Sequence, residues 1–273
     1  MKVTVCELND RSDAFTCDWE RLVSHVQSQQ SEFVLLPEMP FYPWFAGSPS
    51  FEAHVWQAAV AAHDAWQERL VELAPAIVLG TRPVNRGGQR LNEGFWWAPV
   101  EGYRVAHHKY YLPDEPGFWE ASWYSRGDGS FTPLQCGSAR VGFAICTELW
   151  AFDHARLYGE EGIHIIVTPR ATPRETRDKW VVGGRAAAIT SGAFSLSSNH
   201  VSSAADAVHL GGQGWVIAPD GEVLGLTSQE QPFVTIELDL SAAERAKLTY
   251  PRYVFQGRGR ALKSRQASSG VSD

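Results

Sequence analysis

The sequence lacks the features that would place this chain in a membrane or against a nucleic acid. None of its segments reaches the run of about 18 consecutive apolar residues that a membrane-spanning helix needs. Basic residues are the minority, since 24 Lys and Arg face 31 Asp and Glu and the formal charge is -7. A nucleic acid or an anionic membrane surface requires a basic face, so we expect neither as a partner.

Cysteine is also scarce, and its spacing excludes two common uses. The four cysteines are Cys6, Cys17, Cys136 and Cys146, and no two of them form a C-x-x-C pair. Zinc-ribbon and thioredoxin-type motifs are therefore absent. Reduced thiols suit a cytoplasmic protein, and the N-terminal MKVTVCELND reads as a first strand rather than a signal peptide. Because cysteine is among the most buried residue types, we expect the first three to be packing residues.

The sequence does contain enough apolar material for a large core, arranged in alternating strand and helix patterns. Hydrophobic residues make up 44% of the chain. Short apolar runs at 33–36 and 141–145 are typical of buried strands, and the amphipathic stretch at 178–191 predicts a helix. Turns at PVEG and PDGE interrupt the alternation, so we expect an α/β fold with a mixed sheet. We predict one domain over residues 1–273, with a polar, loose tail from about residue 257.

Three residues with reactive side chains occupy equivalent positions in this pattern, because each follows a predicted strand. Glu38 follows the predicted strand FVLL, Lys109 follows a strand around RVAH, and Cys146 follows VGFAI. In open α/β sheets, ligands bind outside the carboxyl ends of strands. A thiol, a carboxylate and an amine are the groups that covalent acyl transfer uses as nucleophile, base and oxyanion partner. The spacing alone does not show that the three side chains meet.

Three blocks of sequence resemble the nitrilase, or carbon–nitrogen hydrolase, superfamily. They are LLPEMPFYPW at 35–44, HHKYYLPDEPGFWE at 107–120 and VGFAICTELWAFDHARLYGEEGIHIIVTPRAT at 141–172. The resemblance is closer to the amidase and carbamoylase branches than to the long true nitrilases. It implies the family's four-layer-type αββα sandwich, with two mixed β-sheets flanked by helices. It also implies a homodimer or larger homo-oligomer and a small-molecule substrate.

The resemblance assigns a role to each matching residue. Glu38 matches the general base, Lys109 the catalytic lysine and Cys146 the nucleophile, which would form an acyl thioester and release ammonia or an amine. Glu120 matches a second active-site glutamate, and Glu115 competes for that role because it lies in the same loop. No metal or organic cofactor is required by this chemistry.

Other residues are candidates for binding the substrate. The backbone N–H of Thr147 would help to hold the oxyanion, and the aromatic side chains of Tyr42 and Trp119 flank the proposed catalytic loops. Arg170 and Arg174 follow the strand after the nucleophile, where a guanidinium suits a substrate carboxylate. The competing interpretations are loop packing for the aromatic residues and a surface or interface position for the arginines.

Two neighbouring polar features have structural interpretations. His107 and His108 are adjacent in a predicted strand, so their side chains point to opposite faces and do not suit a shared metal ion. Glu148 is expected to anchor the turn after the nucleophile through hydrogen bonds to backbone N–H groups. Asn199 matches a family position near the pocket, without a role that the sequence defines.

The sequence defines the class of reaction more closely than it defines the substrate. Cys146 is followed by Thr147 and Glu148. Glu148 resembles the last residue of the Cys-Trp-Glu of nitrilases and departs from the amidase pattern, which has Asp at this position, whereas Thr147 fits neither pattern. The chain is also shorter than typical true nitrilases. We therefore favour hydrolysis of a small amide or N-carbamoyl compound. Hydrolysis of a nitrile, transfer of the acyl group to an amine, and a non-catalytic binding protein on the same fold are the alternatives.

Overall fold

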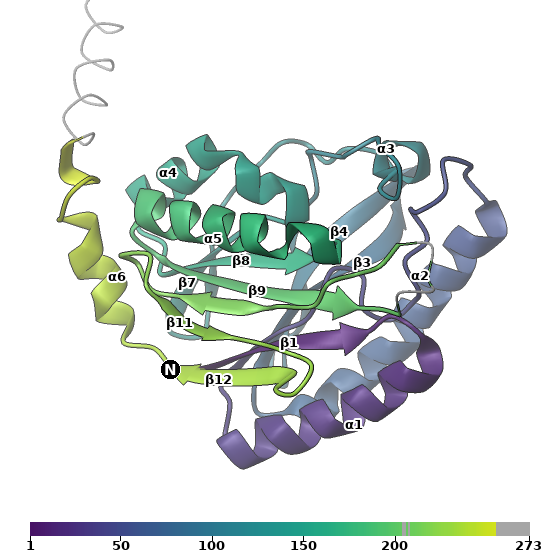
Figure 1. Ribbon diagram of the computed structural model, residues 1–273, viewed down its shortest axis with the longest axis horizontal. Helices are drawn as coiled ribbons and strands as arrows, with labels where there is room; N and C mark the ends of the chain where they lie inside the picture. The colour runs from purple at the N-terminus through teal and green to yellow at the C-terminus, as the bar shows by residue number, and fades with distance from the viewer. Residues whose placement is uncertain (204–205, 207, 255–273) are drawn as a thin grey trace, which may run out of the picture.

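The computed structural model of the chain describes residues 1–203, 206 and 208–254 (Figure 1). The tail predicted from about residue 257 lies outside these residues. In the described part, no helix combines the length and the apolar character needed to cross a membrane.

The strands form two six-stranded halves, which are joined by hydrogen bonds into one continuous 12-stranded sheet. The first half consists of β1 (Lys2–Asn9), β2 (Phe33–Leu35), β3 (Ile77–Arg86), β4 (Gln89–Ala98), β5 (Gly102–His108) and β12 (Phe233–Glu237). The second consists of β6 (Leu134–Cys136), β7 (Ala139–Phe143), β8 (Ile165–Arg170), β9 (Phe194–Val201), β10 (Trp215–Ile217) and β11 (Val223–Leu226). The halves join where Glu7 to Asn9 of β1 pair in parallel with Asn199 to Val201 of β9. Parallel and antiparallel pairs both occur, so the sheet is mixed, as expected.

The two halves pack face to face. A Cβ atom on Gly94 of β4 would lie 3.0 Å from the ring of Phe143 on β7, so a larger residue would push the halves apart. Along β2, Phe33 and Leu35 belong to the core that contains the second half, whereas Val34 points into the core under the first helix. This period of two is what a strand buried on both faces requires.

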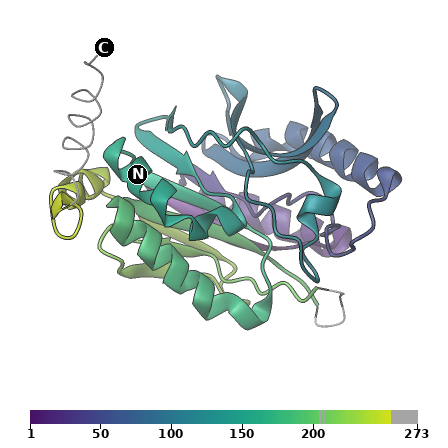
Figure 2. The same cartoon turned by 90° about the horizontal axis from the view of Figure 1, so that it is seen from above.

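Helices cover both outer faces (Figures 1 and 2). The first half is covered by α1 (Ser12–Gln29) and α2 (Ala53–Gln67), and the second by α4 (Phe152–Glu160) and α5 (Arg177–Ser191). The short α3 (Glu120–Trp123) lies in the long loop after β5, and α6 (Leu240–Lys247) follows the last strand. The layers therefore run helix, sheet, sheet, helix, which is the arrangement that the sequence predicted.

The structure corrects three details of the prediction. The apolar run at 77–81 predicts a buried strand that ends at Thr81, whereas β3 continues to Arg86 and forms a long hairpin with β4. The strand β6, which contains Cys136, was not predicted. Cys17 is exposed on α1, whereas Cys6 and Cys136 are buried. The expectation that Cys17 is a packing residue is therefore wrong, because its position on the helix faces away from the sheet.

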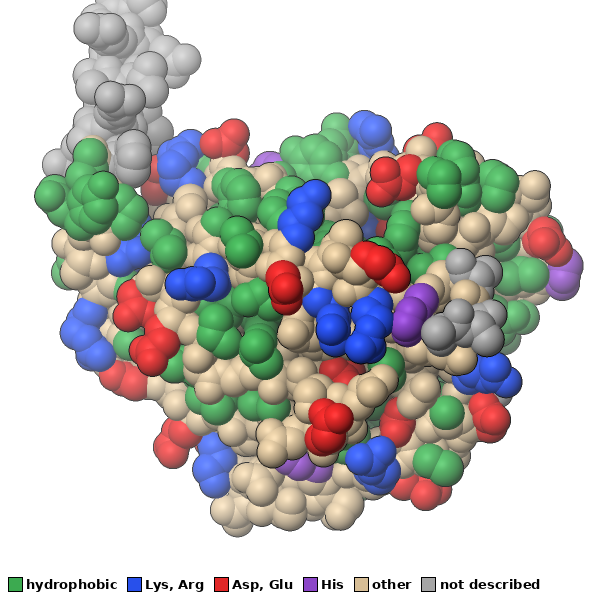
Figure 3. Space-filling view, viewed as in Figure 1, with side chains coloured by type: hydrophobic (Ala, Val, Ile, Leu, Met, Phe, Trp, Pro, Cys, Tyr) green, Lys and Arg blue, Asp and Glu red, His purple; other side chains and the backbone are tan. Residues whose placement is uncertain are grey.

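Acidic and basic side chains are interspersed over the face shown in Figure 3. Hydrophobic side chains gather at its left edge, beside the residues drawn in grey. Leu248 and Tyr250, which follow α6, are each 74% exposed.

Candidate active site

Three strand ends bring an acid, an amine and a thiol to one buried point. Glu38 follows β2, Lys109 follows β5 and Cys146 follows β7 by three residues. The Lys109 ammonium donates hydrogen bonds to Glu38 Oε1 at 2.7 Å and to Glu120 Oε1 at 2.8 Å. The side chains of these three residues are almost fully buried. Burial disfavours the charge on Lys109, but the two carboxylates outweigh it and raise the pKa of the ammonium.

Glu38 is held on both its side chain and its backbone. Asn92 Nδ2 of β4 donates to Glu38 Oε1 at 2.7 Å, so this oxygen accepts from both Asn92 and Lys109. The other oxygen, Oε2, is buried and has no hydrogen-bond partner among the described residues. The imidazole of His200 on β9 donates from Nε2 to the Glu38 carbonyl at 2.7 Å. One carboxylate oxygen is thus fixed, while the other is available to a reacting group.

Glu120, and not Glu115, contacts the lysine. The Glu120 carboxylate lies between Lys109 and the Tyr124 hydroxyl, which donates to Glu120 Oε2. Burial is the largest influence on Glu120 and raises its pKa, with Lys109 opposing and the charge of Glu38 adding to the rise. Glu115 is exposed on the preceding loop. The structure therefore brings Glu120 to the Lys109 ammonium and leaves Glu115 at the edge of the site.

Cys146 occupies a strained turn at the bottom of the site. It opens the short 3-10 helix Cys146–Trp150 with a φ of 49°, a left-handed conformation that non-glycine residues rarely adopt. Such strain persists only where the surrounding structure enforces it, and it is common at functional positions. Burial raises the pKa of the Cys146 thiol, the charge of Glu38 adds to the rise and Lys109 opposes it. In the resting site the sulfur therefore carries its proton at neutral pH.

Glu148 anchors this turn, as the sequence led us to expect. Its carboxylate accepts from the N–H of Ile145 at 2.8 Å and from the N–H of Tyr110 at 2.7 Å, so it ties the strand end bearing Lys109 to the turn bearing Cys146. His107 contacts the same carboxylate at 2.9 Å. Burial alone would lower the pKa of His107, but Glu148 overcomes it and raises the value.

The side chains of the two adjacent histidines point to opposite faces of the strand, as expected. His107 points to Glu148, whereas His108 points to Glu93 on the other face at 3.2 Å. Among the described residues, no group of three or more His, Cys, Asp or Glu side chains is arranged to hold a metal ion.

A cavity of about 230 Å³ opens onto the thiol. Its wall is formed by Pro113, Glu115, Phe118, Glu120, Cys146, Thr147, Trp150, Ala171, Thr172, Pro173, Thr176, Lys179 and Trp180. The predicted residue Thr147 is among them. Tyr42 and Trp119 are not, because both pack into the neighbouring aromatic core, and Phe118 faces the cavity in their place.

The two candidate arginines do not line the cavity. Arg170 is fully buried, and its guanidinium donates to Ser197 Oγ, Thr172 Oγ1 and the Gln213 carbonyl, each at 2.7 Å. Because the Arg170 side chain is fully buried and is not part of the cavity wall, it does not reach a substrate carboxylate there, and that prediction for Arg170 is corrected. Arg174 is exposed, while Pro173 and Thr176 on either side of it form the wall.

Arg170 still acts on the cavity through Thr172. The Thr172 hydroxyl accepts hydrogen bonds from Arg170 Nη1 at 2.7 Å and from Asn199 Nδ2 at 3.0 Å. With both lone pairs occupied, its own hydrogen is left to be donated elsewhere, and Thr172 lines the cavity. The structure thus gives Asn199 a definite task, because its side-chain oxygen also accepts from the Thr172 N–H at 3.0 Å.

Sequence reasoning missed several of these residues. Asn92 lies inside a strand, Tyr124 stands in a segment with many aromatic residues, and no motif marks Thr172 or Lys179. A polar Asn within the buried strand pattern of residues 89–98 was the one available signal, because a buried amide needs partners.

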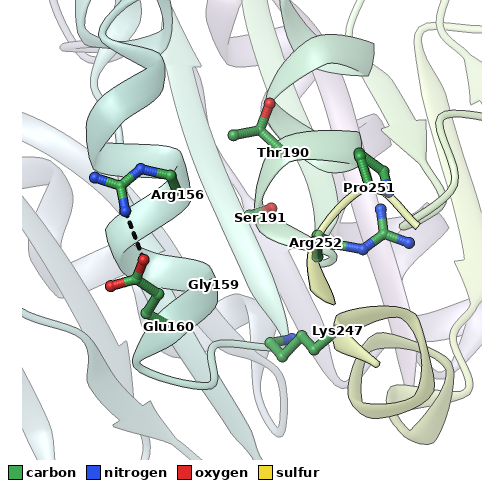
Figure 4. A pocket seen from close by; sticks show the side chains of 8 residues that line it. All are labelled: Arg156, Gly159, Glu160, Thr190, Ser191, Lys247, Pro251 and Arg252. Carbon is green, nitrogen blue, oxygen red and sulfur yellow. Dashed lines mark hydrogen bonds and ion pairs between the residues drawn. The ribbon is translucent and has the colours of Figure 1, made fainter. Parts of the chain in front are cut away.

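A second cavity of about 260 Å³ lies at the opposite end of α4 and α5 (Figure 4). It is lined by Arg156, Gly159, Glu160, Thr190, Ser191, Lys247, Pro251 and Arg252. Lys247 donates to the carbonyls of Ile163 and Gly192, and Arg252 donates to those of Ala246 and Ile189. These cations therefore satisfy the carbonyls at helix ends.

Two sheets between helix layers and a pocket floored by a thiol define a class of α/β protein with a cysteine-centred site. The family model described as carbon-nitrogen hydrolase matches residues 2–248. The chain belongs to the carbon–nitrogen hydrolase family, and the resemblance to this superfamily in the sequence is confirmed.

Comparison with individual proteins agrees with this family. An omega-amidase of Xenopus tropicalis is 23% identical over 226 residues, which cover 81% of each chain. The structure of a carbon-nitrogen hydrolase from Helicobacter pylori superposes with a TM-score of 0.81 at 19% identity, covering 93% of this chain and 94% of the other. A glutamate-to-glutamine mutant of an amidase from Nesterenkonia carries the acetamide moiety of fluoroacetamide on its active-site cysteine. It superposes with a TM-score of 0.74 at 16% identity, covering 90% and 92%. The two structural likenesses show that the fold is shared.

Proposed function

We propose that this protein is a thiol hydrolase that cleaves a small amide, or an N-carbamoyl compound, through an acyl thioester on Cys146. The observation that carries the proposal is the buried contact of Lys109 with Glu38 and Glu120 beside a strained cysteine. A site with this much buried charge is costly to build, and such perturbed groups cluster where chemistry occurs. The names of the similar proteins, an omega-amidase and an amidase, support the amide branch.

In the first half of the reaction, Glu38 is the base. Its unpartnered Oε2 takes the Cys146 proton as the sulfur attacks the carbonyl carbon of the substrate. The proton then passes to the leaving nitrogen, the C–N bond breaks and ammonia departs, which leaves the acyl group on the sulfur. Because burial and the charge of Glu38 raise the pKa of the thiol, the sulfur needs a base to become a nucleophile, and Glu38 supplies it.

The oxyanion of the tetrahedral intermediate requires donors. The Lys109 ammonium has three N–H groups, of which Glu38 and Glu120 accept two. We assign the third, together with the Thr147 N–H at the start of the short helix, to the oxyanion. Glu120 acts as a positioning residue, because it and Tyr124 fix the direction of the Lys109 side chain.

In the second half, water replaces the amine. Glu38 takes a proton from the water, the hydroxide attacks the thioester carbon, and the C–S bond breaks as the proton returns to sulfur. The products are one carboxylic acid and one ammonia for each amide and water consumed.

The test of this proposal is ammonia release from a panel of primary amides and N-carbamoyl compounds, with a Cys146→Ala variant as the blank. We expect release that depends on Cys146 for at least one of the two pools. Equal release by the variant would contradict the assigned nucleophile, and silence of a folded, reduced wild-type enzyme on both pools would contradict the hydrolase.

A further inference from the structure

Two opposite charges face the active-site cavity from different elements. Lys179 belongs to the first turn of α5, and Glu115 belongs to the loop between β5 and α3; both residues line the cavity and both are exposed. Within the part of the chain that the structure describes, neither side chain forms an ion pair at 4.0 Å or less. These two charges play no part in the proposed chemistry at Cys146.

Each of the two residues is held in position. Lys179 Nζ lies 5.7 Å from the centre of the Trp150 ring, and Trp150 is itself part of the cavity wall. Glu115 is fixed through its backbone, since it exchanges hydrogen bonds with Phe118 at 2.8 and 3.3 Å in a tight turn. The mouth therefore presents a cation on the helix side and an anion on the loop side, while Cys146 lies at the inner end.

From this arrangement we infer that the substrate is the side-chain amide of an α-amino acid. Its carboxylate binds the Lys179 ammonium and its ammonium binds the Glu115 carboxylate, with the amide carbon at Cys146. An amino-acid head group carries both charges on one carbon, so it bridges the two walls without leaving either charge unpaired. A volume of about 230 Å³ lies below the usual range of drug-sized pockets and suits a metabolite of this size.

This inference rests on the proposed function and names its substrate class. The reaction consumes one amino-acid amide and one water and yields the corresponding acidic amino acid and ammonia. Trp150 and Trp180 line the same cavity, so their rings offer an apolar surface for the methylene chain between the head group and the amide.

The test uses four amides that share a butyramide chain and differ in the charged groups on its C4 atom. L-glutamine carries both charges, glutaramate only the carboxylate, 4-aminobutyramide only the ammonium, and butyramide neither. We expect kcat/KM to be highest for glutamine and lowest for butyramide, with each charged contact contributing at least about tenfold. Equal values for glutamine and butyramide would overturn the inference while leaving the hydrolase intact. Silence of the wild-type enzyme on all four amides would overturn the inference. Ammonia release from other amides or N-carbamoyl compounds, blanked by Cys146→Ala, then shows whether the proposed function fails as well.

Two variants assign the charges to their residues. Lys179→Met should lower the ratio of kcat/KM for glutaramate over butyramide about tenfold, and Glu115→Gln should lower the ratio for 4-aminobutyramide over butyramide by a similar factor. Asp178→Asn and Asp114→Asn change an exposed charge next to each residue but outside the cavity wall, so both ratios should stay at the wild-type value. Ratios that do not move in the first two variants, or that move equally in the controls, would contradict the assignment.

Discussion

The two cavities at opposite ends of α4 and α5 have similar volumes, about 230 and 260 Å³, but their charged groups do different work. The wall of the larger one includes Lys247 and Arg252 (Figure 4). Both side chains donate to main-chain carbonyls at helix ends. At the smaller one, Lys109 lies between two buried carboxylates and beside a thiol. The charged groups of the larger cavity therefore satisfy helix ends, whereas those of the smaller cavity are reactive groups held close together. The volume of a cavity alone does not identify an active site.

The two sites also differ in unpaired polar atoms and in backbone strain. At the catalytic residues of the proposed site, Glu38 Oε2 is buried without a partner among the described residues, and Cys146 is held in a left-handed conformation. Both features cost stability, and proteins keep such costs where they are used. If this comparison is right, substitutions at the smaller cavity and its catalytic residues should remove activity, and substitutions at the larger cavity should lower stability alone.

The largest effect is expected at the nucleophile. Cys146→Ala should lower kcat by at least about 10⁴-fold, because no other group supplies the covalent step. The side chain loses one atom in a cavity wall, so the melting temperature should stay within about 3 °C of wild type. Turnover and thermal unfolding are measured on the same preparation, and retained turnover would contradict the role of Cys146.

Lys109→Met should damage both activity and stability. The variant leaves Glu38 and Glu120 buried without their cation, and breaking a buried ion pair typically costs about 3–5 kcal/mol. We expect a loss of about 10³-fold in kcat and a fall of roughly 6–20 °C in melting temperature. A loss of activity below tenfold would show that the ammonium does not stabilise the oxyanion.

Tyr124→Phe tests whether Glu120 is a positioning residue. Loss of the hydroxyl leaves one oxygen of Glu120 with a weaker set of partners, which loosens the direction of Lys109. We expect kcat to fall roughly 10-fold with KM unchanged, since the contact stabilises the transition state and not the bound substrate. A variant that raises KM alone would point to a role in binding.

The reactivity of the thiol provides a pH test. Because burial and Glu38 raise the pKa of Cys146 above the ordinary value of 9.0, its thiolate is scarce below that pH and its alkylation by iodoacetamide should be slow at about pH 7. Cys17 is exposed and serves as the internal reference in the same digest. Glu120→Gln removes one of the charges that raise this pKa, so it should speed alkylation of Cys146. Alkylation of Cys146 faster than Cys17 in the wild type would contradict a protonated resting thiol.

The smallest effect is expected at the second cavity. Arg252→Met removes hydrogen bonds to the carbonyls of Ala246 and Ile189, worth about 1–2 kcal/mol together in this partly exposed position. We expect the melting temperature to fall by roughly 2–8 °C and kcat/KM to stay at the wild-type value. A selective loss of activity would show that the two cavities are coupled, and would break the comparison.

The fold was largely predictable because its signals are local or carried by family motifs. Short apolar runs gave the central strands, and the blocks around Glu38, Lys109 and Cys146 implied the sandwich. The strand β6 and the far end of β3 were not predicted, because they are partly exposed and contain no continuous apolar run. Cys17 was misjudged because the buried tendency of cysteine is an average and says nothing of a particular face of a helix.

Within the site, residues at strand ends were predictable and their partners were not. Asn92 reaches Glu38 from β4 of the same half, 54 residues along the chain, so the pairing of the strands brings the two together. Tyr124 lies only four residues after Glu120, but no motif marks its hydroxyl as a partner of that carboxylate. Arg170 shows the reverse error, because a guanidinium after the right strand suggested a substrate contact. The structure instead buries it behind Thr172, through which it reaches the cavity wall.

The acyl thioester on Cys146 is the central claim, and partitioning of the acyl group between water and hydroxylamine tests it most directly. Butyramide and methyl butyrate would give the same butyryl thioester, so the ratio of hydroxamate to butyrate must be identical from the two at one hydroxylamine concentration. Both products must also disappear in Cys146→Ala. Ratios that differ between the amide and the ester would mean that no common intermediate forms, and would contradict covalent catalysis by Cys146.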